Sequence, residues 1–231
     1  MEGSTYVDLF ATKGIEYLLV IGFLAIFVLF WRYINTPIQA WVVPETAKRT
    51  IALTEGWFHL ADGYFYHQGH SWAVPEGNDV VKVGIDDFAQ KLLGRLNSIT
   101  LPQIGEQVQQ GEKGWELRID SKSLPMLSPI DGEVLSINEE VLRSPELINL
   151  DPYGKGWLMK IKVPQMKADL KNLLSGRVAK AWIGETVNAL RQRVDGSLGI
   201  LLQDGGVPVP GIARNISEEN WYQLAREFLM S

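Results

Sequence analysis

The sequence predicts a mainly β domain with peripheral helices, preceded by one N-terminal transmembrane helix and followed by an α/β C-terminal extension. Three observations lead to this fold class. An apolar segment of 20 residues lies near the start of the chain, at 15–34. From Trp57, short aromatic and β-branched runs alternate with Gly, Pro and Asn-Asp, a pattern typical of strands and turns. Beyond residue 174, two helical segments flank a predicted strand.

Composition excludes several classes of function. The chain has 231 residues and a net charge of −5, which gives no support for nucleic-acid binding. It contains no cysteine, so disulfides, thiolate metal sites and thiol nucleophiles are excluded. Phosphate-binding loops and a serine nucleophile elbow are also missing from the sequence. We therefore expect no catalytic activity and no bound metal.

The segment "IEYLLVIGFLAIFVLFWRYI" (15–34) is the predicted membrane anchor. Its only charges, Glu16 and Arg32, lie close to its ends. About 20 helical residues span about 30 Å, the thickness of the bilayer hydrocarbon. Tyr17 and Trp31 suit the two interfaces. A buried core helix and a cleaved signal peptide are the alternatives, but the segment has no polar stripe and no cleavage pattern follows it.

Basic residues predict the orientation of this anchor. Lys13 precedes the segment, whereas Arg32 lies at its C-terminal end and Lys48 and Arg49 follow it. The positive-inside tendency places the C-terminal side in the cytoplasm. We therefore expect a single-pass protein of the inner or cytoplasmic membrane, with a short tail (1–14) outside. Residues 35–56 read as a juxtamembrane connector, because Pro37 and Pro44 interrupt any long helix.

Residues 57–174 form the predicted β domain. A short helix is expected after Asp86, which caps it, and Gly94 ends it. Gly105 and Gly111 mark turns between strands, and Asp131-Gly132 is a hairpin-type turn signal. "DPYGKGWLMKIKV" (151–163) contains a further strand.

Five motifs in this domain resemble the H-protein of the glycine cleavage system, a member of the lipoyl and biotinyl domain superfamily. They are "HSWAV" (70–74), "VGIDDFAQKLLG" (83–94), "LPQIGEQVQQGE" (101–112), "SPIDGEVLSINEEVLRSPELIN" (128–149) and "DPYGKGWLMKIK" (151–162). The resemblance covers about 64–174. It implies a barrel-sandwich hybrid of β-sheets and, in the family, a lipoylated lysine in a tight turn.

The resemblance places Ser121 at the position of that lysine. The family lysine falls sixteen residues after the glycine that matches Gly105, and eight before the proline that matches Pro129; both counts lead to Ser121. Lys122 is one place later. Arg118 stands where the family has an acidic residue, and Pro125 stands in the returning strand.

Two interpretations of this hairpin remain open. In the first, the domain is unlipoylated and serves as a docking module. In the second, the turn tolerates the shift and Lys122 carries lipoate. A shift of one residue re-aims a strand side chain to the opposite face, which favours the first.

Three histidines, His59, His67 and His70, lie in an aromatic-rich stretch. No acidic ligand pattern accompanies them, so we interpret them as packing and hydrogen-bonding residues. A third hypothesis, a small-molecule sensor or enzyme, requires a pocket with convergent polar groups in residues 57–72.

The C-terminal extension (175–231) begins with a helix over 177–194, either continuous or broken at Gly184. A strand, a Gly-Gly turn and an extended return are expected over 196–216. The end is an amphipathic helix with Ser217 as its N-cap. One face carries Trp221, Leu224, Ala225 and Phe228. This face either covers the domain's own core or binds a partner through Trp221, Leu224 and Phe228.

The anchor and the missing lysine together predict a non-catalytic accessory subunit. A shuttle must visit several enzymes, and tethering to a membrane restricts that search. The serine at the family lysine position cannot carry lipoate. We expect the subunit to contact membrane lipid through 15–34 and other subunits of a membrane complex through its β domain. A respiratory or redox complex is the first expectation for that assembly. The alternative is a membrane-tethered carrier with lipoate on Lys122.

Overall fold

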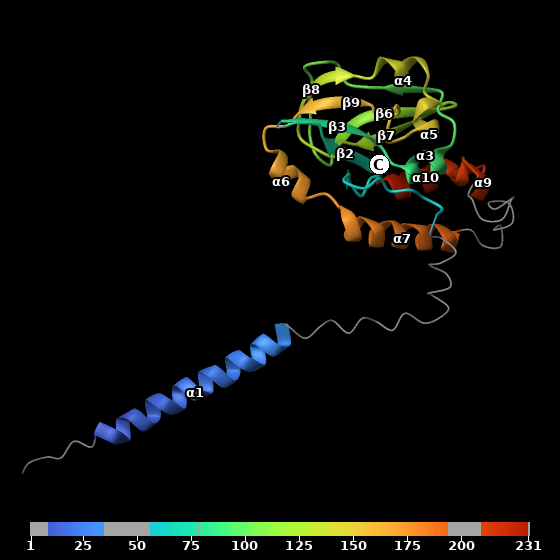
Figure 1. Ribbon diagram of the computed structural model, residues 1–231. Coiled ribbons are helices and arrows are strands. Elements are labelled where there is room, and N and C mark those ends of the chain that lie inside the picture. The colour runs from blue at the N-terminus through green and yellow to red at the C-terminus, as the bar shows by residue number, and fades with distance from the viewer. Residues whose placement is uncertain (1–8, 35–55, 78, 194–208, 231) are drawn as a thin grey trace, which may run out of the picture. The chain divides into compact units, whose positions relative to one another are not determined.

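The computed structural model describes residues 9–34, 56–77, 79–193 and 209–230 (Figure 1). The chain divides into two compact units, residues 1–49 and 50–231. The predicted connector is outside the described residues except for Gly56, and so are the strand and Gly-Gly turn expected between 196 and 206.

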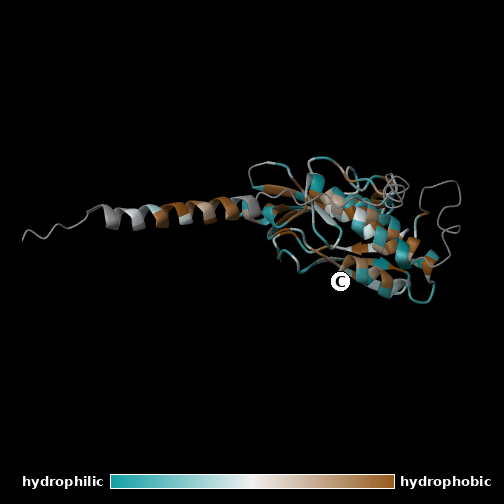
Figure 2. Cartoon of the chain, turned by 90° about the horizontal axis from the view of Figure 1, so that it is seen from below, coloured by the Kyte–Doolittle hydropathy of each residue, from teal (hydrophilic) through white to brown (hydrophobic). Residues whose placement is uncertain are grey.

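The first unit contains helix α1, Leu9–Ile34, which includes the whole predicted anchor segment. Its large apolar side chains between Tyr17 and Trp31 are 49% to 70% exposed. Figure 2 shows that hydrophobic residues dominate this stretch. Phe23, Phe27 and Trp31 stack along one side at intervals of four residues. Within the described residues, no helix is both long and apolar enough to cross a membrane. The helix is confirmed, and its insertion into a bilayer remains a prediction.

The second unit is built on two antiparallel sheets, which confirms the predicted mainly β domain. The larger sheet has the order β1-β2-β3-β9-β8-β5 and the smaller one β4-β6-β7. The strands are β1 Phe65–Tyr66, β2 Ser71–Pro75, β3 Val80–Ile85, β4 Ser98–Thr100, β5 Gln107–Val108, β6 Lys113–Ile119, β7 Lys122–Leu127, β8 Gly132–Ile137 and β9 Met159–Lys162. Apolar side chains from both sheets form one buried core.

Helices surround these sheets (Figure 1). They are α3 Asp87–Leu93, α4 Glu139–Arg143, α5 Leu147–Leu150, α6 Met166–Lys171, α7 Gly176–Arg193, α9 Ile212–Ile216 and α10 Trp221–Leu229. Asp86 caps α3 by accepting a hydrogen bond from the Ala89 amide at 2.8 Å, as predicted. Helix α7 runs without interruption through Gly184.

Three local predictions were wrong. Asp131-Gly132 makes no hairpin, since β7 belongs to the smaller sheet and β8 to the larger one. The end of the expected extended return forms helix α9 instead. Ser217 does not cap the last helix directly, because α10 begins at Trp221. The Ser217 hydroxyl instead accepts a hydrogen bond from the Asn220 amide and so closes the turn before α10.

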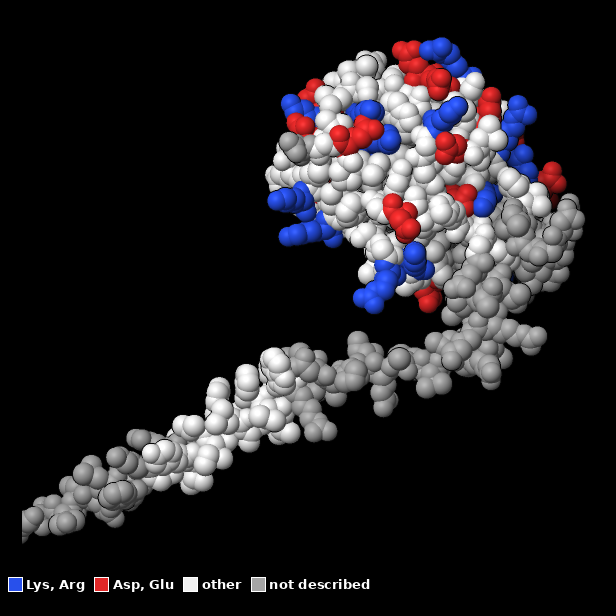
Figure 3. Space-filling model, viewed as in Figure 1, with Lys and Arg blue, Asp and Glu red and all other residues white. Residues whose placement is uncertain are grey.

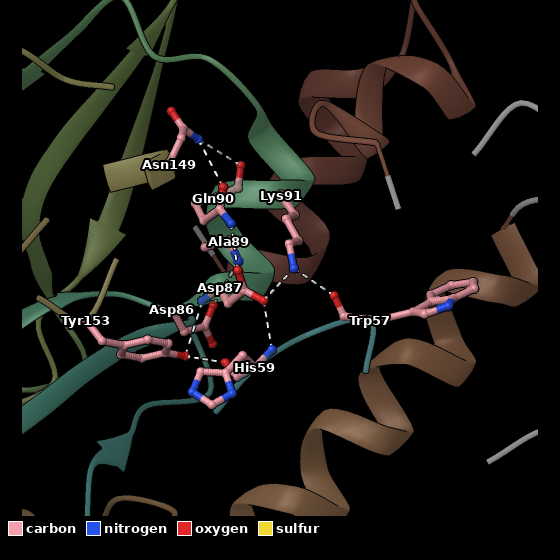
Figure 4. Close-up of polar contacts among 9 residues, drawn as sticks. All are labelled: Trp57, His59, Asp86, Asp87, Ala89, Gln90, Lys91, Asn149 and Tyr153. Atoms are coloured by element: carbon pink, nitrogen blue, oxygen red, sulfur yellow. Dashed lines mark hydrogen bonds and ion pairs between the residues drawn. The ribbon is translucent and has the colours of Figure 1, made fainter. Parts of the chain in front are cut away.

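The segment that follows the connector is fixed to α3 by polar contacts (Figure 4). The Asp87 carboxylate accepts hydrogen bonds from the His59 amide and the Lys91 ammonium, both at 2.7 Å. Lys91 also donates to the Trp57 carbonyl at 2.9 Å. The Tyr153 hydroxyl donates to the His59 carbonyl at 2.7 Å, and burial raises the pKa of this phenol, so it stays protonated. The entry of the chain into the domain is therefore held firmly.

Gly132 is required by close packing rather than by a turn. Its φ is +148°, and a Cβ there would lie 2.2 Å from the Lys162 carbonyl oxygen of the neighbouring strand. Gly105 (φ +89°) has a comparable backbone constraint but open space around it.

Gly132→Ala should therefore destabilise the domain more than Gly105→Ala. Backbone strain alone costs about 1–3 kcal/mol, which is the loss expected for the Gly105 control. The Gly132 variant adds a collision with backbone atoms. Unfolding of the full chain in urea measures both, and equal losses would contradict the account of Gly132.

Candidate functional site at the hairpin tip

The tip of the β6–β7 hairpin is a two-residue turn. Ile119, the last residue of β6, pairs with Lys122, the first residue of β7. Asp120 and Ser121 therefore close the turn. Asp120 adopts φ +51°, a conformation that Asp tolerates better than most residues. The turn itself thus carries no amine.

Lys122 lies on the face of β7 that carries core side chains. Because side chains alternate along a strand, Lys122 shares its face with Leu124 and Met126, which are both buried. The Lys122 side chain is exposed at the end of this row, and its Nζ lies 5.5 Å from the centroid of the Tyr222 ring. That distance is within the range of a cation–π contact. The amine therefore lies against α10.

Helix α10 also covers the open edge of the smaller sheet. β7 is an edge strand, and the Tyr222 hydroxyl donates a hydrogen bond to the Ser123 carbonyl at 2.9 Å. Pro125 is tolerated in β7 because an edge strand does not need every amide for pairing. An uncovered edge exposes unpaired backbone groups, so α10 protects the sheet from unwanted pairing.

The tip is also held from two other directions. The Asp120 amide donates to the Asn97 side-chain oxygen at 2.6 Å, and the Asp120 carboxylate forms an ion pair with Arg214 of α9. The Arg214 guanidinium carbon lies 5.1 Å from the centroid of the Trp221 ring. Arg214 therefore joins the tip to the start of α10.

Helix α9 lies next to the tip because its first residues pack on the C-terminal end of α3. The Gly211 amide donates to the Lys91 carbonyl at 2.8 Å. Gly94 ends α3 with φ +75°, and a Cβ on Gly94 would lie 2.8 Å from the Gly211 nitrogen. Two glycines thus allow the backbones to approach closely.

The opposite face of the hairpin is polar. The Ser123 hydroxyl donates to the Glu116 carboxylate at 2.7 Å, and Lys113 pairs with the same carboxylate. The Lys113 contact, followed by the Ser123 hydrogen bond, lowers the pKa of Glu116. Its contribution to stability is therefore present above the ordinary Glu pKa and is lost as the pH falls through the lowered value.

The structure favours the interpretation that the apolar face of the amphipathic helix covers the domain's own core. Trp221 is buried in the core, while Leu224 and Phe228 are partly buried and pack against it. The Phe228 ring lies 5.7 Å from Phe88 of α3. These three side chains, predicted as a possible partner surface, are therefore largely occupied by the domain itself.

The histidines have structural surroundings. His70 is buried, its Nδ1 lies 2.8 Å from an Asp86 carboxylate oxygen, and its ring packs between Phe88 and Trp182. The His67 ring accepts a hydrogen bond from the Gly69 amide. In the described part of the chain, no group of three His, Asp or Glu side chains is placed to hold a metal ion.

Sequence reasoning identified Ser121 and Lys122 but missed the residues that cover them. Asn97, Arg214 and Tyr222 lie far from the hairpin in the sequence, so no local spacing connects them to it. The one usable signal was the apolar face of 217–230, which indicated that this segment packs on something.

Replacing Tyr222 should free the Lys122 amine. Tyr222→Ala removes the ring and the hydrogen bond to Ser123, whereas Tyr222→Phe removes only the hydrogen bond, at a cost of about 1 kcal/mol. We expect faster reaction of Lys122 with an amine reagent in the Ala variant and a smaller increase in the Phe variant. Peptide mass spectrometry gives both rates, with Lys171 on α6 as internal reference. An unchanged Lys122 rate in Tyr222→Ala would show that α10 does not cover the amine.

Comparison with known proteins agrees with this fold. The sequence model of the family described as Glycine cleavage H-protein matches residues 64–186. A probable glycine cleavage system H protein of Pyrococcus horikoshii is 39% identical over 119 residues, which cover 52% of this chain and 88% of that protein. The glycine cleavage system H protein of Thermus thermophilus is 40% identical over 110 residues, covering 48% and 84%.

A solved structure is also similar. The crystal structure of a glycine cleavage system H protein from Mycobacterium marinum has a TM-score of 0.48 and 27% identity, and the match covers 55% of this chain and 98% of that one. The range matched by the family model contains both sheets and ends inside α7, so α1, α9 and α10 lie outside it. Because the family model matches more than half of the chain and the two sequence relatives are 39% and 40% identical, the chain belongs to the glycine cleavage H-protein family.

Proposed function

We propose that this chain is a non-catalytic, unlipoylated H-protein-like subunit that is anchored in a membrane and docks on other subunits of a membrane-bound assembly. The family normally carries lipoate on a lysine. The observation that carries the proposal is the two-residue turn at the hairpin tip, which contains Asp120 and Ser121 and no lysine.

The surroundings of Lys122 support the absence of lipoate. A modifying enzyme must reach the amine and the backbone that presents it. Here the amine lies against Tyr222, and the turn is tied to Asn97 and Arg214. Contacts from α9 and α10 therefore restrict access to the turn and to the amine. The lysine is both shifted by one position and partly obstructed.

The exposed apolar surface of α1 supports anchoring. A helix in water with large apolar side chains about half to two-thirds exposed has no favourable burial for them, whereas lipid provides it. The polar contacts at Trp57 and His59 would then hold the domain firmly at the end of its tether. A respiratory or redox assembly is the first class in which to look for partners.

A lipoyl carrier modified on Lys122 is the second candidate. Family membership and the exposure of the Lys122 side chain favour it. It differs from the first candidate in one property, the chemical state of Lys122.

Treatment with lipoate and a lipoate ligase tests the proposal. The wild-type chain should remain unmodified under conditions in which an authentic glycine cleavage H protein is fully modified. The matched variant combines Ser121→Lys with Lys122→Ser, so composition is unchanged and only the position of the amine differs. Modification of this variant but not of the wild-type chain would show that the position of the lysine in the hairpin prevents lipoylation.

Two further results complete this test. If neither protein is modified, the swapped variant is repeated with Tyr222→Ala and Arg214→Ala, and modification then identifies the cover as the obstacle. Ready modification of wild-type Lys122 would contradict the proposal and establish the carrier function.

A further inference from the structure

Basic residues are concentrated in one segment of this acidic chain. Residues 160–180 contain six Lys or Arg and one Asp, although the whole chain has a net charge of −5. Four of the six belong to α6 and the first turns of α7. We call this set the basic face; it comprises Lys167, Lys171, Arg177 and Lys180.

All four side chains of the basic face are exposed. Lys167 and Lys171 are four residues apart, and Arg177 and Lys180 are three apart, so each pair shares one side of its helix. Like charges at these spacings disfavour the helix slightly. Figure 3 shows blue side chains projecting from the α6 side of the domain with no red neighbour beside them.

The domain provides little compensation for these charges. The one acidic residue of the segment, Asp169, is buried, and its carboxylate accepts a hydrogen bond from the Asp131 amide. Burial raises the pKa of Asp169. Among the described residues, the sole salt bridge of the basic face joins Lys180 to Asp62 at 3.8 Å, between two well-exposed groups.

The distribution of charge on this surface suits a broad anionic partner. Its charges are spread over two helices, and the apolar Val178 between them is 61% exposed. Lipid headgroups present many diffuse negative charges in a plane, with apolar material directly below. If α1 is anchored as proposed, the connector of 35–56 keeps the domain within several tens of ångströms of a bilayer. Tethering of this kind strongly raises the effective concentration of the surface.

We propose that the basic face docks the domain onto anionic phospholipid headgroups of the membrane that holds α1. This inference rests on the proposed membrane anchoring but concerns a different surface. Each basic side chain near an anionic surface strengthens the association about fivefold, and salt screens the effect.

The full chain reconstituted in lipid vesicles provides the test. One vesicle preparation contains phosphatidylcholine alone, and the other adds phosphatidylglycerol. The rate at which an amine reagent labels Lys167 should fall in the anionic vesicles and recover in high salt. Lys171→Glu should abolish most of this protection, because it removes one attraction and adds one repulsion.

The matched control is Arg143→Glu on α4, which makes the same change of charge at the other end of the domain (Figure 1). It should leave the protection of Lys167 unchanged. Equal labelling of Lys167 in both lipids would overturn the inference. So would protection that depends on added partner subunits rather than on lipid charge, since the face would then bind an acidic protein.

Flotation of the same vesicles separates the two proposals. If the protein does not float with either lipid, the anchoring proposal fails. The inference about the basic face then fails as well, because it rests on that anchoring. If it floats with both lipids but Lys167 is labelled equally, anchoring stands and the basic face has no role in lipid binding.

Discussion

The pairing of Ile119 with Lys122 sets the chemistry of the hairpin tip. Strand side chains alternate between faces, so this register places Lys122 in the row that continues into buried Leu124 and Met126. It leaves Asp120 and Ser121 for the turn. A shift of one residue would put the amine in the turn itself. In the proposed account, whether this domain serves as a carrier or as a docking module depends on a single step of backbone register.

Helix α3 connects this hairpin to the rest of the domain. Its Asp87 and Lys91 side chains hold the segment that contains Trp57 and His59. At its C-terminal end, the Lys91 carbonyl accepts a hydrogen bond from the Gly211 amide. Phe88 packs against both His70 and Phe228. One short helix therefore supports the chain where it enters the domain and where α9 and α10 return to cover the tip.

Local features were well predicted from sequence, and distant contacts were not. The cap at Asp86, the end of α3 at Gly94 and the turns at Gly105 and Gly111 follow from residues within a few positions of one another. Gly132 was misread because its constraint comes from Lys162, thirty residues later on another strand. The cover of the tip joins residues 94 and 99 positions apart, Arg214 with Asp120 and Tyr222 with Ser123. Such contacts depend on how the whole domain packs.

We propose that this H-protein-like domain works without lipoate. The most direct measurement is the intact mass of the protein purified in detergent from its native source, with peptide mapping across residues 119–131. Without lipoate, Lys122 should be unmodified in essentially all molecules, and partner subunits should co-purify. A lipoyl-sized mass increment on Lys122 would contradict the proposal and would make the protein a tethered carrier.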